Sequence, residues 1–192
     1  MKSTLGFAIT GSFCTFSKIL VEMKNLIDEG YKIVPIFSYT VAKTDTRFFI
    51  ASDFRQKVVE ITQNEPIDTL TSAEPLGPKG IIDVMVVAPC TGNTLSKISL
   101  AITDTPVTMA VKAHLRNNKP VVIGLSSNDA MGLNLKNLGT LMQAKNVYFV
   151  PFGQDDFLKK PNSLISDLRL IGPTVEKALQ GQQLQPVIIP NK

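Results

Sequence analysis

The sequence contains few of the residues that bind metals or form disulfides. It has one histidine, two cysteines and no tryptophan. Because no histidines and cysteines stand at metal-ligand spacing, a metal site is not expected. The amino-terminal residues do not have the pattern of an export signal, so we expect a cytoplasmic protein in which both thiols are free.

Long apolar runs and dense basic runs are also missing. No stretch approaches a run of about 18 apolar residues, the length that indicates a membrane-spanning helix. The net charge is +4, but the basic residues are scattered, which argues against binding to nucleic acid. With 44% hydrophobic and 19% charged residues, the 192-residue chain has the composition of a globular protein. We expect a single domain over residues 1–192, with an irregular carboxyl-terminal segment from about residue 151.

Apolar runs typical of strands alternate with segments of helical periodicity. Strands are expected at residues 4–10, 32–38, 81–88, 120–125 and 147–150. Helices are expected at residues 16–27, 54–61, 93–102, 106–117, 133–144 and 173–180. The stretches 38–46 and 64–79 are polar or rich in Pro and Gly and are expected to be irregular, with a short strand near Leu70. This alternation predicts an α/β fold, a Rossmann-like or flavodoxin-like three-layer sandwich with a mostly parallel sheet.

Small and hydroxyl-bearing residues follow four of the expected strands. These polar loops lie near Gly11, Ser38, Pro89 and Ser126. The carboxyl ends of parallel strands meet at one edge of a sheet, where open α/β sheets bind their ligands. The sequence therefore predicts a ligand site at this edge.

Two of these loops can be interpreted either as parts of a ligand site or as purely structural turns. The turn at residues 11–15 can present backbone amides and the Ser12 hydroxyl to a phosphate, or it can be a plain strand-to-helix turn with a hydroxyl cap. It contains neither the glycine pattern of dinucleotide-binding folds nor that of a Walker loop. Residues 89–94 offer small polar groups and close backbone approach, and they can also cap a helix.

Other reactive side chains are expected to have structural roles. Cys14 and Cys90 fall at the same edge and are interpreted as small, partly buried structural cysteines rather than a redox pair. His114 lies on an expected helix far from the loops and lacks the partners of a catalytic histidine. Asp104 either orients a neighbouring loop or an intersubunit contact, or is solvated. The charged loop at 155–160 is either solvated or covers the site edge and holds an acidic substrate.

At these residues the chain resembles the flavin mononucleotide (FMN) proteins that include phosphopantothenoylcysteine decarboxylase and the flavin prenyltransferases. In that family a Gly-Ser-type turn holds the flavin phosphate, and an Ala-Pro-x-Ser/Thr-x-Asn-Thr-x-x-Lys-Ile segment, matched here by residues 88–98, lines the flavin. The resemblance implies bound FMN. The residues that it places at the cofactor are Gly11, Ser12, Phe13, Ser38, Thr40, Pro89, Cys90, Thr91, Asn93, Thr94, Ser126 and Ser127.

The sequence departs from both kinds of relative at their catalytic residues. The histidine of the decarboxylases, expected after Thr46, is absent from residues 48–71. Their Pro-Ala-Met-Asn motif is reduced to residues 129–131, with Asn134 displaced. The Arg-Glu pair of the prenyltransferases does not follow the fifth strand. No catalytic residue can therefore be carried over from either group.

Four further segments resemble one branch of this family, the flavoprotein-like chains of a two-chain oxidoreductase of spore-forming bacteria. They are residues 76–79, 126–134, 150–155 and 160–164. The branch implies oxidation of a cyclic dicarboxylate to an aromatic product in the mother-cell cytoplasm. The companion chain resembles nucleotide-binding dehydrogenases and would carry NADP.

Three cationic residues, Lys43, Arg47 and Lys97, are candidate clamps for this dicarboxylate. The helices after Asn93 and Pro106 are expected to form a homo-oligomer, as in the family. Two alternatives remain open. One is a non-catalytic structural component of the same complex, and the other is a flavin prenyltransferase-like protein.

Overall fold

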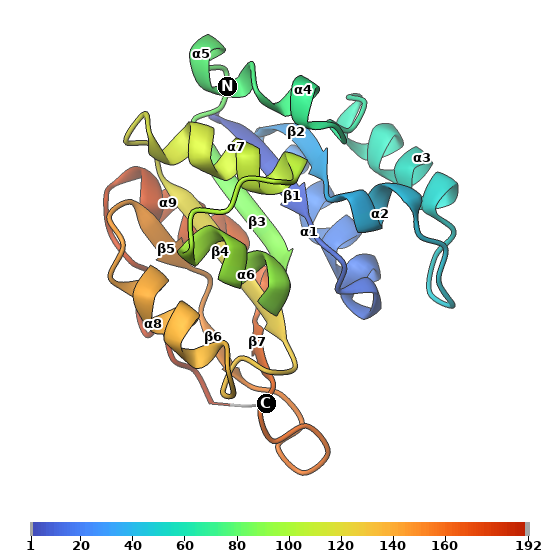
Figure 1. The fold of residues 1–192 in the computed structure, drawn as a ribbon. Helices are drawn as coiled ribbons and strands as arrows, with labels where there is room; N and C mark the ends of the chain where they lie inside the picture. Colours follow the sequence, from blue (N-terminus) through green and yellow to red (C-terminus); the bar gives the residue numbers. More distant parts are fainter. Residues whose placement is uncertain (1, 191–192) are drawn as a thin grey trace.

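Five parallel strands form the centre of the molecule in the computed structural model, which describes residues 2–190 (Figure 1). Their order across the sheet is β2-β1-β3-β4-β5. Their bounds are β1 Thr4–Ile9, β2 Lys32–Phe37, β3 Val84–Cys90, β4 Val121–Ser127 and β5 Val147–Phe149. This arrangement confirms the predicted α/β fold with a mostly parallel sheet.

Two antiparallel strands continue the sheet beyond the carboxyl end of β4. β7 (Leu164–Ser166) pairs with Ser126 and Ser127 of β4, and β6 (Phe152–Gln154) pairs with β7. The sequence predicts irregular structure after about residue 151, so these two strands were not expected. Each is three residues long, which is too short for the period-2 pattern of a strand to be recognised.

Helices cover both faces of the sheet, and each face has its own hydrophobic core. α1 (Phe16–Asp28), α3 (Ala51–Thr62) and α9 (Ile171–Leu179) pack on one face. α6 (Gly92–Ser99), α7 (Pro106–Leu115) and α8 (Leu135–Met142) pack on the other. Side chains of β3 alternate between the two cores, since Val86 joins the first and Val87 the second. The molecule therefore has the predicted three-layer sandwich architecture.

Short helices occupy the stretches that were expected to be irregular. α2 (Tyr39–Lys43) follows β2, because the Ser38 hydroxyl accepts a hydrogen bond from the amide of Val41 and caps the turn. The strand expected near Leu70 is wrong: a Thr69 capping box starts α4 (Leu70–Ala73) there. α5 (Leu76–Lys79) comes next, and the one strand-like pairing in this part joins Ile67 to Ile36.

Several boundaries differ from the expected ones by a few residues. β3 begins at Val84 rather than at residue 81, and Ser126 and Ser127 belong to β4 rather than to the following loop. Short 3-10 segments precede two helices, η1 (Phe13–Thr15) before α1 and η2 (Leu168–Leu170) before α9. Within the described residues, no helix is long and apolar enough to cross a membrane.

Candidate functional site

The buried Thr10 side chain joins the ends of β1 and β3. Its hydroxyl donates a hydrogen bond to the carbonyl oxygen of Pro89 at 2.7 Å and accepts one from the amide of Thr91 at 3.0 Å. Thr10 is only 1% exposed, so both bonds are protected from water. They fix the relative positions of two of the predicted polar loops.

A second contact joins the β1 loop to the end of β4. The hydroxyl oxygens of Ser12 and Ser126 lie 2.7 Å apart. Since β3 separates β1 from β4 in the sheet, this contact spans the carboxyl end of β3. The turn at 11–15 and the end of β4 therefore face each other, as expected for a ligand site at this edge of the sheet.

The loop after β2 reaches the same place through α2. The Ser38 amide donates to the carbonyl of Ile9 at 3.1 Å, which holds the start of α2 against the end of β1. Thr40 faces Gly11, because a Cβ atom added to Gly11 would lie 3.4 Å from the Thr40 Cγ2 atom. A side chain at position 11 would therefore contact both Thr40 and Phe13.

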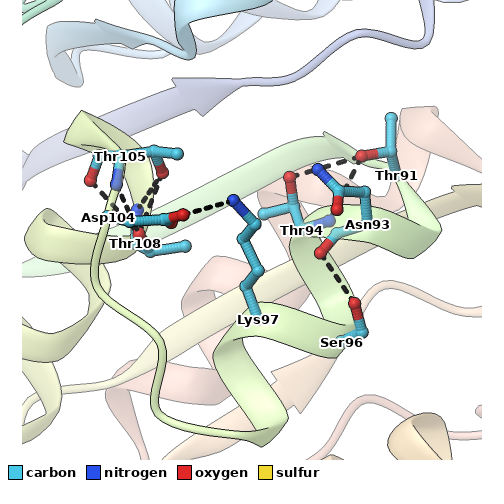
Figure 2. Close-up of polar contacts among 8 residues, drawn as sticks. All are labelled: Thr91, Asn93, Thr94, Ser96, Lys97, Asp104, Thr105 and Thr108. Atoms are coloured by element: carbon cyan, nitrogen blue, oxygen red, sulfur yellow. Dashed lines mark hydrogen bonds and ion pairs between the residues drawn. The ribbon is translucent and has the colours of Figure 1, made fainter.

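The start of α6 contributes the fourth loop. Thr91 is the N-cap residue: its hydroxyl accepts a hydrogen bond from the Thr94 amide and donates one to the Thr94 hydroxyl (Figure 2). Asn93 is exposed, and its carbonyl oxygen accepts a bond from the Ser96 hydroxyl. The segment therefore caps a helix, but the cap is Thr91, and the expected caps Asn93 and Thr94 lie inside the first turn.

A carboxylate at the end of β4 was not identified from the sequence. Asp129 accepts hydrogen bonds from the Ser127 hydroxyl and from the Asn134 side-chain amide, each at 2.6 Å. Asn134 in turn accepts a bond from Asn137 on α8. Gly92 lies against this network, since a Cβ atom there would stand 2.5 Å from Asp129 Oδ1. Only knowledge of which loops meet could have revealed this arrangement.

The two cysteines have different environments. The expected burial of Cys14 is wrong, because Cys14 is exposed in the turn after β1, with its sulfur 3.9 Å from the Ser12 hydroxyl. Cys90 is buried, since it lies within β3. Burial raises the pKa of the Cys90 thiol to about 12. Cys90 is therefore a neutral core side chain, and only its backbone is available to a ligand. Phe13, also among the predicted contacts, packs its ring on Phe16 with a centroid separation of 5.1 Å.

The other cationic and titratable residues considered from the sequence lie in separate parts of the fold. His114 is near Asp83 and Pro120, which precede β3 and β4, and thus sits toward the opposite edge. Lys97, a candidate clamp, pairs with Asp104 at 2.7 Å, and this hydrogen bond lowers the pKa of the Asp104 carboxyl (Figure 2). The ion pair with Asp104 therefore fixes the position of the Lys97 ammonium group. Lys43 and Arg47 each lie over an aromatic ring.

Three cavities lie away from the predicted site. They measure about 500, 650 and 700 Å³ and are lined by parts of α1, α8, α9 and the carboxyl-terminal segment. None of the twelve predicted cofactor residues lines these three cavities, so the four polar loops lie at the sheet edge outside them. Within residues 2–190, no three His, Cys, Asp or Glu side chains gather as they would around a metal ion.

Comparison with known proteins supports the fold and the resemblance. The flavoprotein family model matches residues 1–168. The chain is 49% identical to the B subunit of dipicolinate synthase of Bacillus subtilis over 187 residues, covering 97% of this chain and 94% of that protein. This confirms the branch of the family indicated by the sequence.

Solved structures agree. The crystal structure of the B subunit of dipicolinate synthase from Bacillus halodurans superimposes with a TM-score of 0.91 at 48% identity, covering 99% of this chain and 97% of that one. The DmrB protein of Burkholderia xenovorans, solved in complex with FMN, has a TM-score of 0.70 at 15% identity, covering 93% and 96% of the two chains. At that identity the likeness shows a shared fold.

Proposed function

The chain belongs to the flavoprotein family, and we propose that it acts as the B subunit of a dipicolinate synthase, taking part in the oxidation of dihydrodipicolinate to dipicolinate. The observation that carries the proposal is the meeting of Thr10, Ser12, Thr91 and Ser126 at one sheet edge. It occurs in a chain that matches a protein of that name over nearly its whole length. Because a B subunit implies a companion chain, the A subunit of dipicolinate synthase is the proposed partner.

The residues at this edge fit FMN. They offer hydroxyl groups from four loops and the amides of Phe13 and Cys14 at the start of η1, whereas the Thr15 amide donates to the Ser12 carbonyl. Gly11 has no side chain, so a phosphate can approach its backbone. No acidic side chain belongs to the turn at 11–15, so it suits a dianion.

We assign the chain's residues by these contacts. Gly11, Ser12 and Phe13 would hold the phosphate, and Ser38 and Thr40 would contact the flavin. The flavin would also be lined by Pro89, Cys90, Thr91, Asn93, Thr94, Ser126 and Ser127, with the buried Cys90 acting through its backbone. When bound, FMN supplies a hydride acceptor, and the protein orients the substrate ring and excludes water. Formation of an aromatic ring favours the reaction.

The proposed complex contains other components. NADP would be carried by the companion chain, and both chains would work in the cytoplasm of the mother cell. The open edge would be completed by a further copy of this chain, in a single-domain homo-oligomer. Two apolar side chains between α6 and α7 suit such a contact, since Leu100 is 65% exposed and Ile102 is 42% exposed.

Titration of the purified chain with FMN tests the cofactor assignment. Free FMN fluoresces, and binding is expected to quench it, with riboflavin binding more weakly because it lacks the phosphate. The Ser12→Ala variant should bind FMN about tenfold more weakly, the effect of one hydrogen bond to a charged group. Ser52→Ala, on the exposed side of α3, is the matched control and should bind as the wild type does.

Activity in the presence of the companion chain separates a catalytic role from a structural one. If Ser12→Ala lowers dipicolinate formation while it still associates with the companion chain, the catalytic role is supported. If neither the chain nor the two-chain complex binds FMN, yet the complex is active, the chain has a structural role and the flavin assignment is wrong.

A further inference from the structure

The loop that joins β6 to β7 projects beside the predicted site. β7 pairs with Ser126 and Ser127, two of the proposed flavin contacts, so residues 155–163 leave the sheet at the end of β4 (Figure 1, orange loop). This loop carries two lysines and two aspartates.

Hydrogen bonds within the loop fix the backbone of Lys160. Its amide donates to the carbonyl of Asp156 at 2.6 Å, and its carbonyl accepts from the amide of Ser163 at 3.0 Å. The amide of Asp155 donates to the carbonyl of Ser163 at 3.0 Å, which closes the base of the loop. The loop is therefore a folded turn with a defined position for Lys160.

Further contacts fasten this turn to the edge of the sheet. The amide of Met131 donates to the carbonyl of Asn162 at 3.0 Å, and the Ser163 hydroxyl lies 3.5 Å from the Asn128 side-chain oxygen. The Lys160 ammonium pairs with Asp155, which accepts a bond from the Ser163 hydroxyl that faces Asn128. Lys160 thus lies beside the segment that follows β4.

The two lysines of the loop differ in how firmly they are held. The Lys160 ammonium lies 3.0 Å from Asp155, and Asp155 also accepts a bond from the Ser163 hydroxyl. Lys159 is 86% exposed at its side chain and lies 3.9 Å from Asp156. An ammonium group has three donors, so Lys160 can keep its bond to Asp155 and still donate to a second anion.

We propose that Lys160 is a specificity-determining residue that binds one carboxylate of the dicarboxylate substrate at the sheet edge. The proposal rests on the proposed function, which supplies the substrate. Asp155 is a positioning residue, because it holds the ammonium group in place before the substrate arrives.

Calorimetry tests the proposal, with dipicolinate titrated into the FMN-loaded complex of this chain and its companion chain. Lys160→Gln should weaken dipicolinate binding about tenfold, as loss of one charge-assisted hydrogen bond would. Lys159→Gln is the matched control and should change the affinity less than about twofold. Lys160→Arg should retain most of the affinity, and Asp155→Asn should lose part of it.

Three results would overturn the assignment. The first is an unchanged dipicolinate affinity in Lys160→Gln, and the second is no dipicolinate binding by the wild type. The third is a Lys160→Gln variant that loses affinity for FMN rather than for dipicolinate, which would show that the ammonium group serves the phosphate. Because FMN binding is measured separately on the wild type, failure of the proposed function is distinguished from failure at Lys160.

Discussion

The hydroxyl groups of Ser12 and Ser126 lie 2.7 Å apart, although the two residues are 114 positions apart in the sequence. They come from strands that are not neighbours in the sheet, and the end of β3 lies between them. Any group resting on the end of β3 therefore meets hydroxyls from both sides. This contact is what makes one site out of separate loops.

Replacement of Gly92 tests how tightly α6 is packed against the end of β4. In Gly92→Ala the new Cβ would stand 2.5 to 2.7 Å from Asp129, Ser127 and Asn134, whose hydrogen bonds leave them little freedom to move. We expect the free energy of unfolding to fall by about 1–3 kcal/mol in urea denaturation.

Gly139→Ala on α8 is the matched control for this substitution. No atom lies within 4 Å of its added Cβ, so the change should be neutral or should raise the free energy of unfolding by about 0.5–1 kcal/mol through helix propensity. Equal losses in both variants would show that the network around Asp129 yields easily.

Acid should destabilise the protein through His114. Burial, with Lys119, lowers the pKa of His114 to about 4 from 6.5, and its Nε2 has no hydrogen-bond partner among the described residues. The unfolded chain therefore takes up a proton below pH 6.5 that the folded chain refuses until about pH 4. The stabilisation is present above pH 6.5 and is lost as the pH falls to 4, by about 3 kcal/mol in total.

Denaturation curves of the wild type and of His114→Gln over this pH range measure the effect. The difference in unfolding free energy between the two proteins should shrink as the pH falls, because carboxylates titrate alike in both. A difference that stays constant from pH 7 to pH 4 would rule out His114 as the source.

The two thiols should differ in reactivity. Cys14 is exposed, whereas Cys90 is buried with a pKa of about 12, and only a thiolate attacks a disulfide reagent. With an aromatic disulfide reagent at pH 8, one thiol per chain should react quickly and the second only after denaturation. Cys14→Ser should remove the fast phase, and a fast phase that persists in it would contradict the assignment.

Much of the fold was predictable because long elements carry their own signals. β1 is a continuous apolar run, and α1 has helical spacing that ends before Gly30, which adopts a φ of +94°. The edge of the sheet followed from the order of strands and helices alone. The sequence therefore predicted that the turn at 11–15 and Ser126 lie at the same edge, but it did not predict the hydrogen bond between them.

The remaining features depend on contacts between distant parts of the chain. β7 is recognised as a strand only because it pairs with Ser126 and Ser127, and three residues carry no periodicity. α2 and α4 are set by single capping residues, Ser38 and Thr69, whose preference for helix starts is also a preference for turns. The contact of Asp129 with the start of α6 at Gly92 could be found only in the structure.

The pairing of β7 with the end of β4 has a consequence for how the protein is made. The central sheet can assemble once about 150 residues have left the ribosome, because β5 ends at Phe149. The rim beside Ser126 has to wait for Leu164–Ser166, which are synthesised later. A chain that ends before Leu164 would have the five parallel strands but would lack this rim and α9, which packs on one face of the sheet. It should not compete with complete chains for flavin.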